Sequence, residues 1–249
     1  MRNPILCGVL VLVACGGDKG AVPADPDAAA TTPVGGATIT GLARFSGTAP
    51  ANPTIDMREE AACAAKYTGA ITDPQVVATN GMLANVFVYV KSGLPAGATY
   101  AVPTTPVVVD QDGCLYHPRV FGAMVNQTIE IVNSDPLLHN IKAVPTTNRG
   151  FNISQPSQGM RTIRRFAAAE IMVPLECSVH GWMNAFVGVV SHPFFATTGT
   201  DGSFSLRGLP AGTYELEAWH EKFGTRTTTV TVTESGTATA EFSFAPNTR

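Results

Sequence analysis

The run Cys177–Met183 (CSVHGWM) constrains the fold of this chain more than any other segment. It places a thiolate, an imidazole and a thioether on one short loop, at the spacing C-x2-H-x2-M. Metal sites that combine one thiolate with a weak axial thioether take two imidazoles, so a second histidine has to come from elsewhere. His139, in the segment Asn133–Asn140 (NSDPLLHN), is the candidate. The fold therefore has to bring together two loops that are well separated in the sequence.

These ligand types favour copper over zinc. A thiolate favours Cu(I), imidazoles accept either oxidation state, and a distant methionine lets the geometry stay nearly unchanged when one electron enters or leaves. Zinc sites use thiolates, imidazoles or carboxylates and do not use methionine. The predicted ligands are His139, Cys177, His180 and Met183, around one copper ion that alternates between Cu(I) and Cu(II).

The span from about Gly81 to His192 resembles the cupredoxins, the blue copper proteins, and is most similar to the amicyanin and pseudoazurin type. In that family a His followed by Asn lies after one strand, and Cys, His and Met lie on the loop before the last strand. The resemblance implies a Greek-key β-sandwich, a type 1 copper site and an electron carrier. It also implies that the backbone N–H of Asn140 bonds the Cys177 sulfur, and that electrons pass through His180 at the solvent edge.

Alternating or continuous apolar runs predict the strands around these ligands. Thr128–Val132 leads into His139, and Ala185–Val190 follows Met183 as a final sandwich strand. Further strands are expected at three places upstream: Ala37–Phe45, Met82–Val90 and Val107–Val109. We expect these strands to extend the copper domain over residues 37–192.

A second unit is expected over residues 193–249. Thr200–Leu206 and Leu209–Trp219 read as strands that follow turns. Their pattern, G-x-F-x-L-x-x-L-P-x-G-x-Y-x-L-x-A-W, resembles the carboxypeptidase regulatory-like, or prealbumin-like, β-sandwich domain, a class that binds or supports rather than catalyses. The unit is small for an independent core, so we expect it to pack on the copper domain. The predicted fold class is all-β, with two sandwiches.

The amino terminus indicates a secreted protein. Ile5–Ala14 is apolar but too short to cross a bilayer as a helix, so residues 1–14 are predicted to be a signal peptide. Leu12–Cys15 resembles the bacterial lipobox, which implies lipidation of Cys15; an ordinary signal peptide with a chance cysteine is the alternative. Asp18 does not directly follow Cys15, so we expect an anchor on the periplasmic face of the outer membrane. Residues 15–36 form the expected flexible linker.

The remaining cysteines predict one disulfide. Cys63, Cys114 and Cys177 stay after the signal segment and the lipidation site are set aside. Pairing Cys63 with Cys114 leaves Cys177 free for the metal, and the periplasm oxidises such pairs. Two free buried thiols are the alternative. Cys63 lies on an expected short helix capped by Asp56 and Glu59.

The composition limits the classes of partner and of reaction that fit this chain. The chain has 16 Lys plus Arg against 19 Asp plus Glu and lacks a phosphate-binding loop, which argues against nucleic acid. We expect a periplasmic redox protein as partner, besides the membrane. No H-x-H pair occurs, so a copper enzyme is not predicted. The alternative function is copper storage, delivery or sensing, with the C-terminal domain docking to a partner or a glycan. His117, His192 and His220 are expected to be ordinary histidines.

Overall fold

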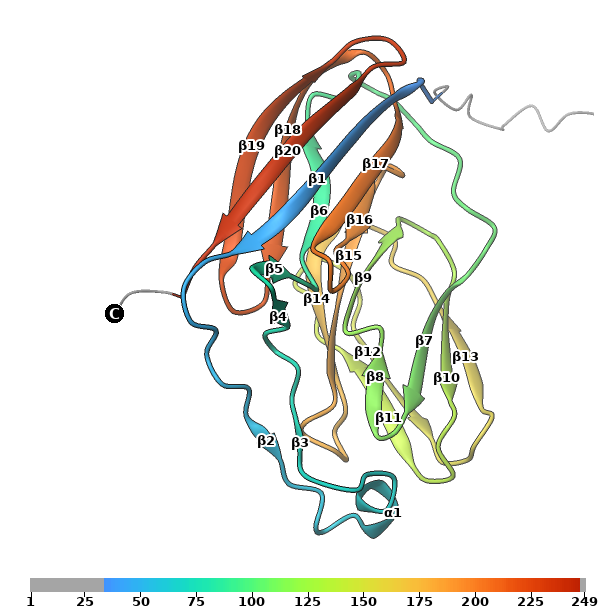
Figure 1. Cartoon of the computed structure of the whole chain (residues 1–249). Helices are drawn as coiled ribbons and strands as arrows, with labels where there is room; N and C mark the ends of the chain where they lie inside the picture. The colour runs from blue at the N-terminus through green and yellow to red at the C-terminus, as the bar shows by residue number, and fades with distance from the viewer. Residues whose placement is uncertain (1–33, 247–249) are drawn as a thin grey trace, which may run out of the picture. The chain divides into compact units, whose positions relative to one another are not determined.

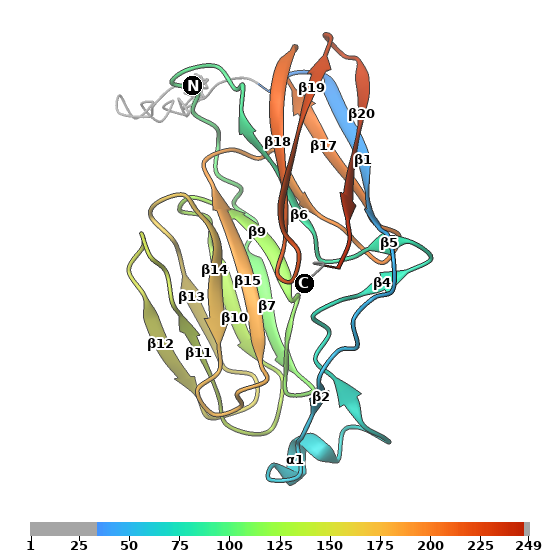
Figure 2. The same ribbon diagram turned by 90° about the vertical axis from the view of Figure 1, so that its left-hand side faces the viewer.

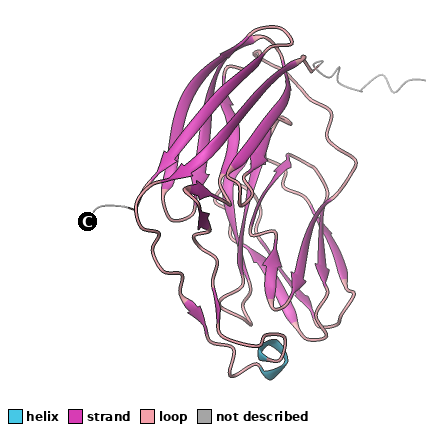
Figure 3. Cartoon of the chain, in the orientation of Figure 1, coloured by secondary structure: helices cyan, strands magenta, loops and turns pink. Residues whose placement is uncertain are grey.

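The computed structural model describes residues 34–246 of the chain. The expected signal segment, the lipidation site Cys15 and nearly all of the linker lie outside these residues. In the described part strands predominate, and the helix α1 (Ala61–Ala64) is short (Figure 3). Within residues 34–246, none of the helical structure is both long enough and apolar enough to cross a membrane.

Residues 107–190 form one β-sandwich, which we call the inserted sandwich (Figure 1). Each of its two sheets contains one parallel pair of strands, β7 (Val107–Asp112) with β10 (Ile129–Asn133) and β9 (Val120–Met124) with β15 (Asn184–Val190). Apolar side chains such as Ile131, Ile141 and Val187 fill the space between the sheets. The first sheet has the strand order β13 (Arg161–Arg164), β10 (Ile129–Asn133), β7 (Val107–Asp112), β8 (Leu115–His117). The second sheet has the strand order β12 (Phe151–Gln155), β11 (His139–Ala143), β14 (Glu170–Glu176), β15 (Asn184–Val190), β9 (Val120–Met124).

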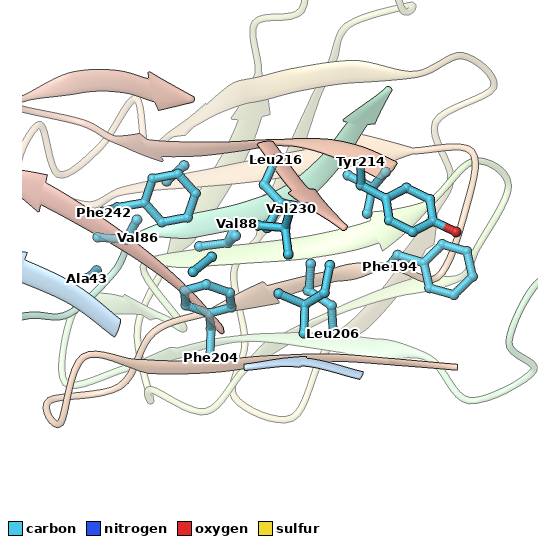
Figure 4. Packing of buried hydrophobic residues seen from close by; sticks show 14 of the residues in the cluster. Ala43, Val86, Val88, Phe194, Phe204, Leu206, Tyr214, Leu216, Val230 and Phe242 are labelled. Carbon is cyan, nitrogen blue, oxygen red and sulfur yellow. The ribbon is translucent and has the colours of Figure 1, made fainter. Parts of the chain in front are cut away.

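A second sandwich contains the C-terminal strands. Its core includes Phe204, Leu206, Tyr214, Leu216 and Phe242, whose side chains lie between the strands in Figure 4. One sheet has the strand order β17 (Ser203–Leu209), β1 (Ala37–Phe45), β5 (Met82–Leu83), β4 (Ala78–Thr79). In this sheet β20 (Thr237–Phe244) also pairs with β1, and the pair is parallel. The other sheet has the strand order β16 (Phe195–Thr197), β6 (Phe87–Ser92), β18 (Gly212–His220), β19 (Gly224–Val232). The all-β fold class with two sandwiches, predicted from the sequence, is confirmed.

The strand pairing corrects the predicted domain division. β1 pairs with β17 and β20, and β6 pairs with β16 and β18, so both strands complete the second sandwich rather than extend the copper domain over 37–192. The physical reason is that β16–β20 need neighbours to cover their edges. The alternating apolar pattern of β1 fits either sandwich equally well, so the pattern does not decide between them. The inserted sandwich therefore interrupts the second sandwich, between β6 and β16.

The two sandwiches share an apolar interface, as expected for the small second unit. Phe87 and Tyr89 on β6 pack with Val120 and Val190 of the inserted sandwich. Space for Phe87 comes from Gly188 on β15, where a Cβ atom would lie 2.5 Å from the Phe87 ring.

A hairpin insertion between β1 and β4 extends beyond the second sandwich in both views (Figures 1 and 2). Residues 54–72, which we call the flap, comprise β2 (Thr54–Ile55), α1 and β3 (Ile71–Thr72), with β2 paired to β3. Cys63 on α1 forms a disulfide with Cys114 in the β7–β8 turn. The predicted capping of α1 by Asp56 and Glu59 is corrected. Glu60 is the N-cap residue and makes no side-chain capping bond, and the Asp56 carboxylate binds Arg58 rather than the helix.

A buried ion cluster joins the flap and the two sandwiches. The Arg119 guanidinium donates to Glu221 at 2.5 and 2.9 Å, and to Asp73 at 2.5 Å. Arg119 precedes β9, Asp73 directly follows the flap and Glu221 follows β18. All three side chains are about nine-tenths buried, so each charge depends on the others for compensation.

Candidate metal centre

The ends of two neighbouring strands position the predicted ligands. His139 is the first residue of β11, and Cys177 directly follows β14. His180 and Met183 lie on the connection from β14 to β15. Backbone hydrogen bonds close this connection: Cys177 N donates to Met183 O at 3.1 Å and Met183 N donates to His180 O at 3.0 Å. The turn therefore holds the backbones of its three ligand-type residues close together.

Three of the four predicted residues meet at one buried point. The Nδ1 atoms of His139 and His180 lie 3.0 Å apart, and Cys177 Sγ lies 3.8 Å from His180 Nδ1. All three donor atoms lie within 4.8 Å of one another, and the residues are 0, 2 and 5% exposed for His139, His180 and Cys177. Metal–donor bonds of about 2.0–2.3 Å can span such a triangle. The two imidazoles and the thiol thus fit the donor set that copper takes in trigonal sites.

Met183 is fully buried in the apolar cluster that also contains Cys177. Its backbone binds both neighbouring ligand residues, as described above. Met183 is therefore a buried residue of the same closed turn that bears Cys177 and His180.

A buried carboxylate orients the His139 ring. His139 Nε2 lies 2.8 Å from Asp135 Oδ2, so Nε2 carries the proton and Nδ1 keeps its lone pair for an ion. Asp135 also accepts from the backbone N–H groups of Gly113 and Cys114 and forms an ion pair with Lys66. Burial raises the pKa of Asp135, but the bonds from Lys66 and His139 outweigh it, and the net shift is downward.

Sequence reasoning did not assign a role to Asp135. A usable signal was present, because Asp135 precedes His139 by four residues in NSDPLLHN, and metal-bound imidazoles commonly donate their outer N–H to a carboxylate. Lys66 carries no such signal, because the flap that delivers it folds over from a distant part of the chain.

The environment of Cys177 favours the thiolate. Burial raises the pKa of the thiol, whereas His139 and the backbone groups of Asn140, His180 and Val179 lower it, with a net downward shift. His180 N donates to Sγ at 3.4 Å, and Sγ lies 3.2 Å from Asn140 Oδ1. The backbone of Asn140, which the resemblance implied as a partner of the sulfur, is thus among the groups that stabilise its charge.

The expected solvent edge at His180 is corrected by the structure. His180 is only 2% exposed, because the flap covers its outer side. Its Nε2 atom has no hydrogen-bond partner among the residues described, and it lies 3.6 Å from Glu60 Oε2 on the flap. The Trp182 ring lies 5.2 Å away and is fixed by a hydrogen bond from Nε1 to Cys114 O. Burial, followed by the neighbouring His139, lowers the pKa of His180.

The other histidines of the described region lie away from this cluster. His117 is exposed on β8, with Nε2 3.2 Å from Asp112 O. His192 is buried and bonds Val90 O at 2.9 Å. His220 lies in the core of the second sandwich, where its ring stacks on Phe223, and burial lowers its pKa to about 4.

Comparisons with known proteins agree with part of this picture. Residues 183–245 match the family model of the carboxypeptidase regulatory-like domain. The match begins at Met183, so it runs through β15 before it reaches β16–β20 of the second sandwich. None of the curated proteins matches the chain. This match agrees with the predicted resemblance of the C-terminal unit to the carboxypeptidase regulatory-like domain, and β1 and β6 complete the sandwich to which that unit belongs.

Several solved structures of copper proteins are similar to this chain. A copper-containing nitrite reductase (NirK) from Thermus scotoductus SA-01 is 22% identical over 41% of this chain and 26% of its own, with a TM-score of 0.31. A purple cupredoxin from Nitrosopumilus maritimus is 21% identical over 33% of this chain and 98% of its own, with a TM-score of 0.29. An amicyanin variant in its Cu(I) form is 19% identical over 41% of this chain and 97% of its own, with a TM-score of 0.31. This chain thus spans about a quarter of the reductase.

Proposed function

We propose that this protein binds one copper ion through His139, Cys177 and His180, with Met183 as a weak axial ligand, and carries single electrons. The observation that supports this best is the buried triangle of two Nδ1 atoms and one sulfur. Two imidazoles, one thiolate and a distant thioether form the ligand set of electron-transfer copper sites.

The residues around the ligands support electron transfer by limiting rearrangement. Asp135 fixes the His139 ring, and backbone bonds fix the turn that bears Cys177 and Met183. Buried apolar neighbours exclude water. Copper would supply the one-electron chemistry, while the chain would hold a geometry that suits both oxidation states.

The test is titration of the purified protein with Cu(II), followed by visible spectroscopy. We expect an intense thiolate-to-copper absorption in the wild type and none in Cys177→Ser. His117→Gln is the matched control, because His117 is exposed and away from the cluster, and it should keep the absorption. Binding of zinc in preference to copper, with no coloured copper form, would contradict the proposal.

We also propose that the protein acts in the periplasm, anchored through Cys15 to the outer membrane, with a redox protein as partner. The disulfide between Cys63 and Cys114 supports an oxidising compartment. Membrane fractionation tests the anchor: Cys15→Ser should move the protein to the soluble fraction, and retention in the membrane would contradict it.

Copper storage, delivery or sensing is the second candidate, and the burial of His180 under the flap favours it. A covered imidazole edge slows electron exchange with a partner. Voltammetry separates the two functions: a reversible wave with fast self-exchange supports the electron carrier, and slow cycling with ready transfer of copper to an acceptor supports the alternative.

A further inference from the structure

Both imidazoles of the site face a carboxylate on the side away from the ion. Asp135 belongs to the inserted sandwich and lies behind His139, and Glu60 belongs to the flap and lies behind His180. We propose that Glu60 is a positioning residue, which holds the outer nitrogen of His180 and thereby closes the flap over the site. This inference rests on the proposed copper site.

The tautomer of His180 gives Glu60 its role. Nδ1 of His180 faces the sulfur and the other imidazole, so an ion at that point leaves the proton on Nε2. That N–H group is buried, and no other acceptor for it exists among the residues described. A buried donor needs an acceptor, and the Glu60 carboxylate at 3.6 Å needs only a small side-chain movement to become one.

The backbone of Glu60 is held firmly enough to position a ring. Its carbonyl accepts from the backbone N–H groups of Cys63 and Ala64, both at 3.0 Å, which ties it to α1. The disulfide from Cys63 to Cys114 then ties α1 to the inserted sandwich. Nearby, Tyr67 donates to Gly113 O at 2.5 Å.

Apolar packing connects the flap to the ligands themselves. Ile55 and Met57 of the flap belong to the same buried cluster as Cys177 and Met183. Closure by Glu60 therefore shields the thiol as well as the imidazole. The carboxylate also adds a negative charge beside the site, which favours Cu(II) over Cu(I) and lowers the reduction potential.

The test compares Glu60→Ala, Glu60→Gln and the matched control Glu59→Ala, a change at an exposed neighbouring carboxylate. The first measurement needs no copper: the rate at which an alkylating reagent modifies Cys177 in the metal-free protein, read by mass spectrometry of its peptide. Glu60→Ala should react faster than the wild type. Glu60→Gln should react at nearly the wild-type rate, because the amide can pair with Nε2 in either tautomer: its oxygen accepts from a protonated Nε2 and its N–H group donates to an unprotonated one.

The second measurement uses the copper-loaded protein. Cu affinity should fall about 10- to 100-fold in Glu60→Ala, as for other residues that orient metal-bound imidazoles. The reduction potential should rise in both Glu60 variants, because both remove the negative charge, and it should stay unchanged in Glu59→Ala.

Equal alkylation rates, affinities and potentials in Glu60→Ala and Glu59→Ala would overturn the inference. The two proposals fail separately. A wild type that binds no copper overturns the proposed function together with the role of Glu60 at a copper site, whereas copper binding that ignores Glu60 overturns this inference alone.

Discussion

Asp135 precedes His139 by four residues and holds the ring nitrogen of His139 that faces away from His180. Its own position is fixed by two backbone N–H groups and by Lys66, so the orientation of one ligand depends on a strand end, a turn and the flap. At the scale of residues, the site therefore consists of more than its ligands. Side chains one step from the ion decide which nitrogen is free to bind it.

The variant Asp135→Asn tests this dependence. An amide keeps the shape of the side chain, but it lacks the charge that compensates Lys66 and is a weaker acceptor for His139 Nε2–H. Copper affinity should fall about 10- to 100-fold, measured by competition with a Cu(I) chelator. Asp112→Asn is the control, because Asp112 is an exposed carboxylate that also lies near Lys66, at 3.4 Å. Equal affinities in the two variants would show that Asp135 does not orient the ring.

At the scale of elements, the loop between β14 and β15 was predictable, and the flap was not. C-x2-H-x2-M is a local pattern whose chemistry can be read directly, and the apolar run after it predicted β15. The flap that lies against His180 is more than 100 residues upstream of it in the sequence. A local sequence pattern does not indicate the surface on which a hairpin packs. The assignment of β1 and β6 failed for a related reason, since a strand pattern records a buried face but not the partner strand.

The disulfide between Cys63 and Cys114 fixes the flap and closes a loop across a sequence separation of 51. Loss of this cross-link in the double variant Cys63→Ser, Cys114→Ser should lower the free energy of unfolding by about 4 kcal/mol, because the unfolded chain gains the freedom of that loop. Denaturant unfolding at equilibrium measures it. An unchanged midpoint would mean that the packing of Ile55 and Met57 holds the flap without the bond.

At the scale of the whole described structure, the two sandwiches are joined by the chain, by the apolar interface around Phe87 and by Arg119. Arg119 is the polar link among these, because its partners come from the flap end and from the second sandwich. Because the cluster is buried, the stability of the protein depends on all three of its members: removing one leaves the others charged and uncompensated.

The variant Arg119→Ala should destabilise the protein by about 3–5 kcal/mol, because it leaves Asp73 and Glu221 buried without a counter-charge. Thermal and denaturant unfolding measure the loss. The control is Arg44→Ala, which breaks the exposed pair with Glu241 between β1 and β20 and should change stability far less. Similar losses in both variants would show that burial does not set the importance of Arg119.

The position of β1 has a consequence for how the chain assembles during synthesis. Thr38 and Thr237 are neighbours in the parallel pair of β1 with β20, so the first strand of the described region needs the last one. Contacts between distant parts of a sequence form slowly because the intervening chain has to be ordered first. Residues 107–190 contain all the strands of their own sandwich, and they leave the ribosome earlier. The inserted sandwich can thus fold before β20 is available to pair with β1. The second sandwich is completed only after β20 has been translated.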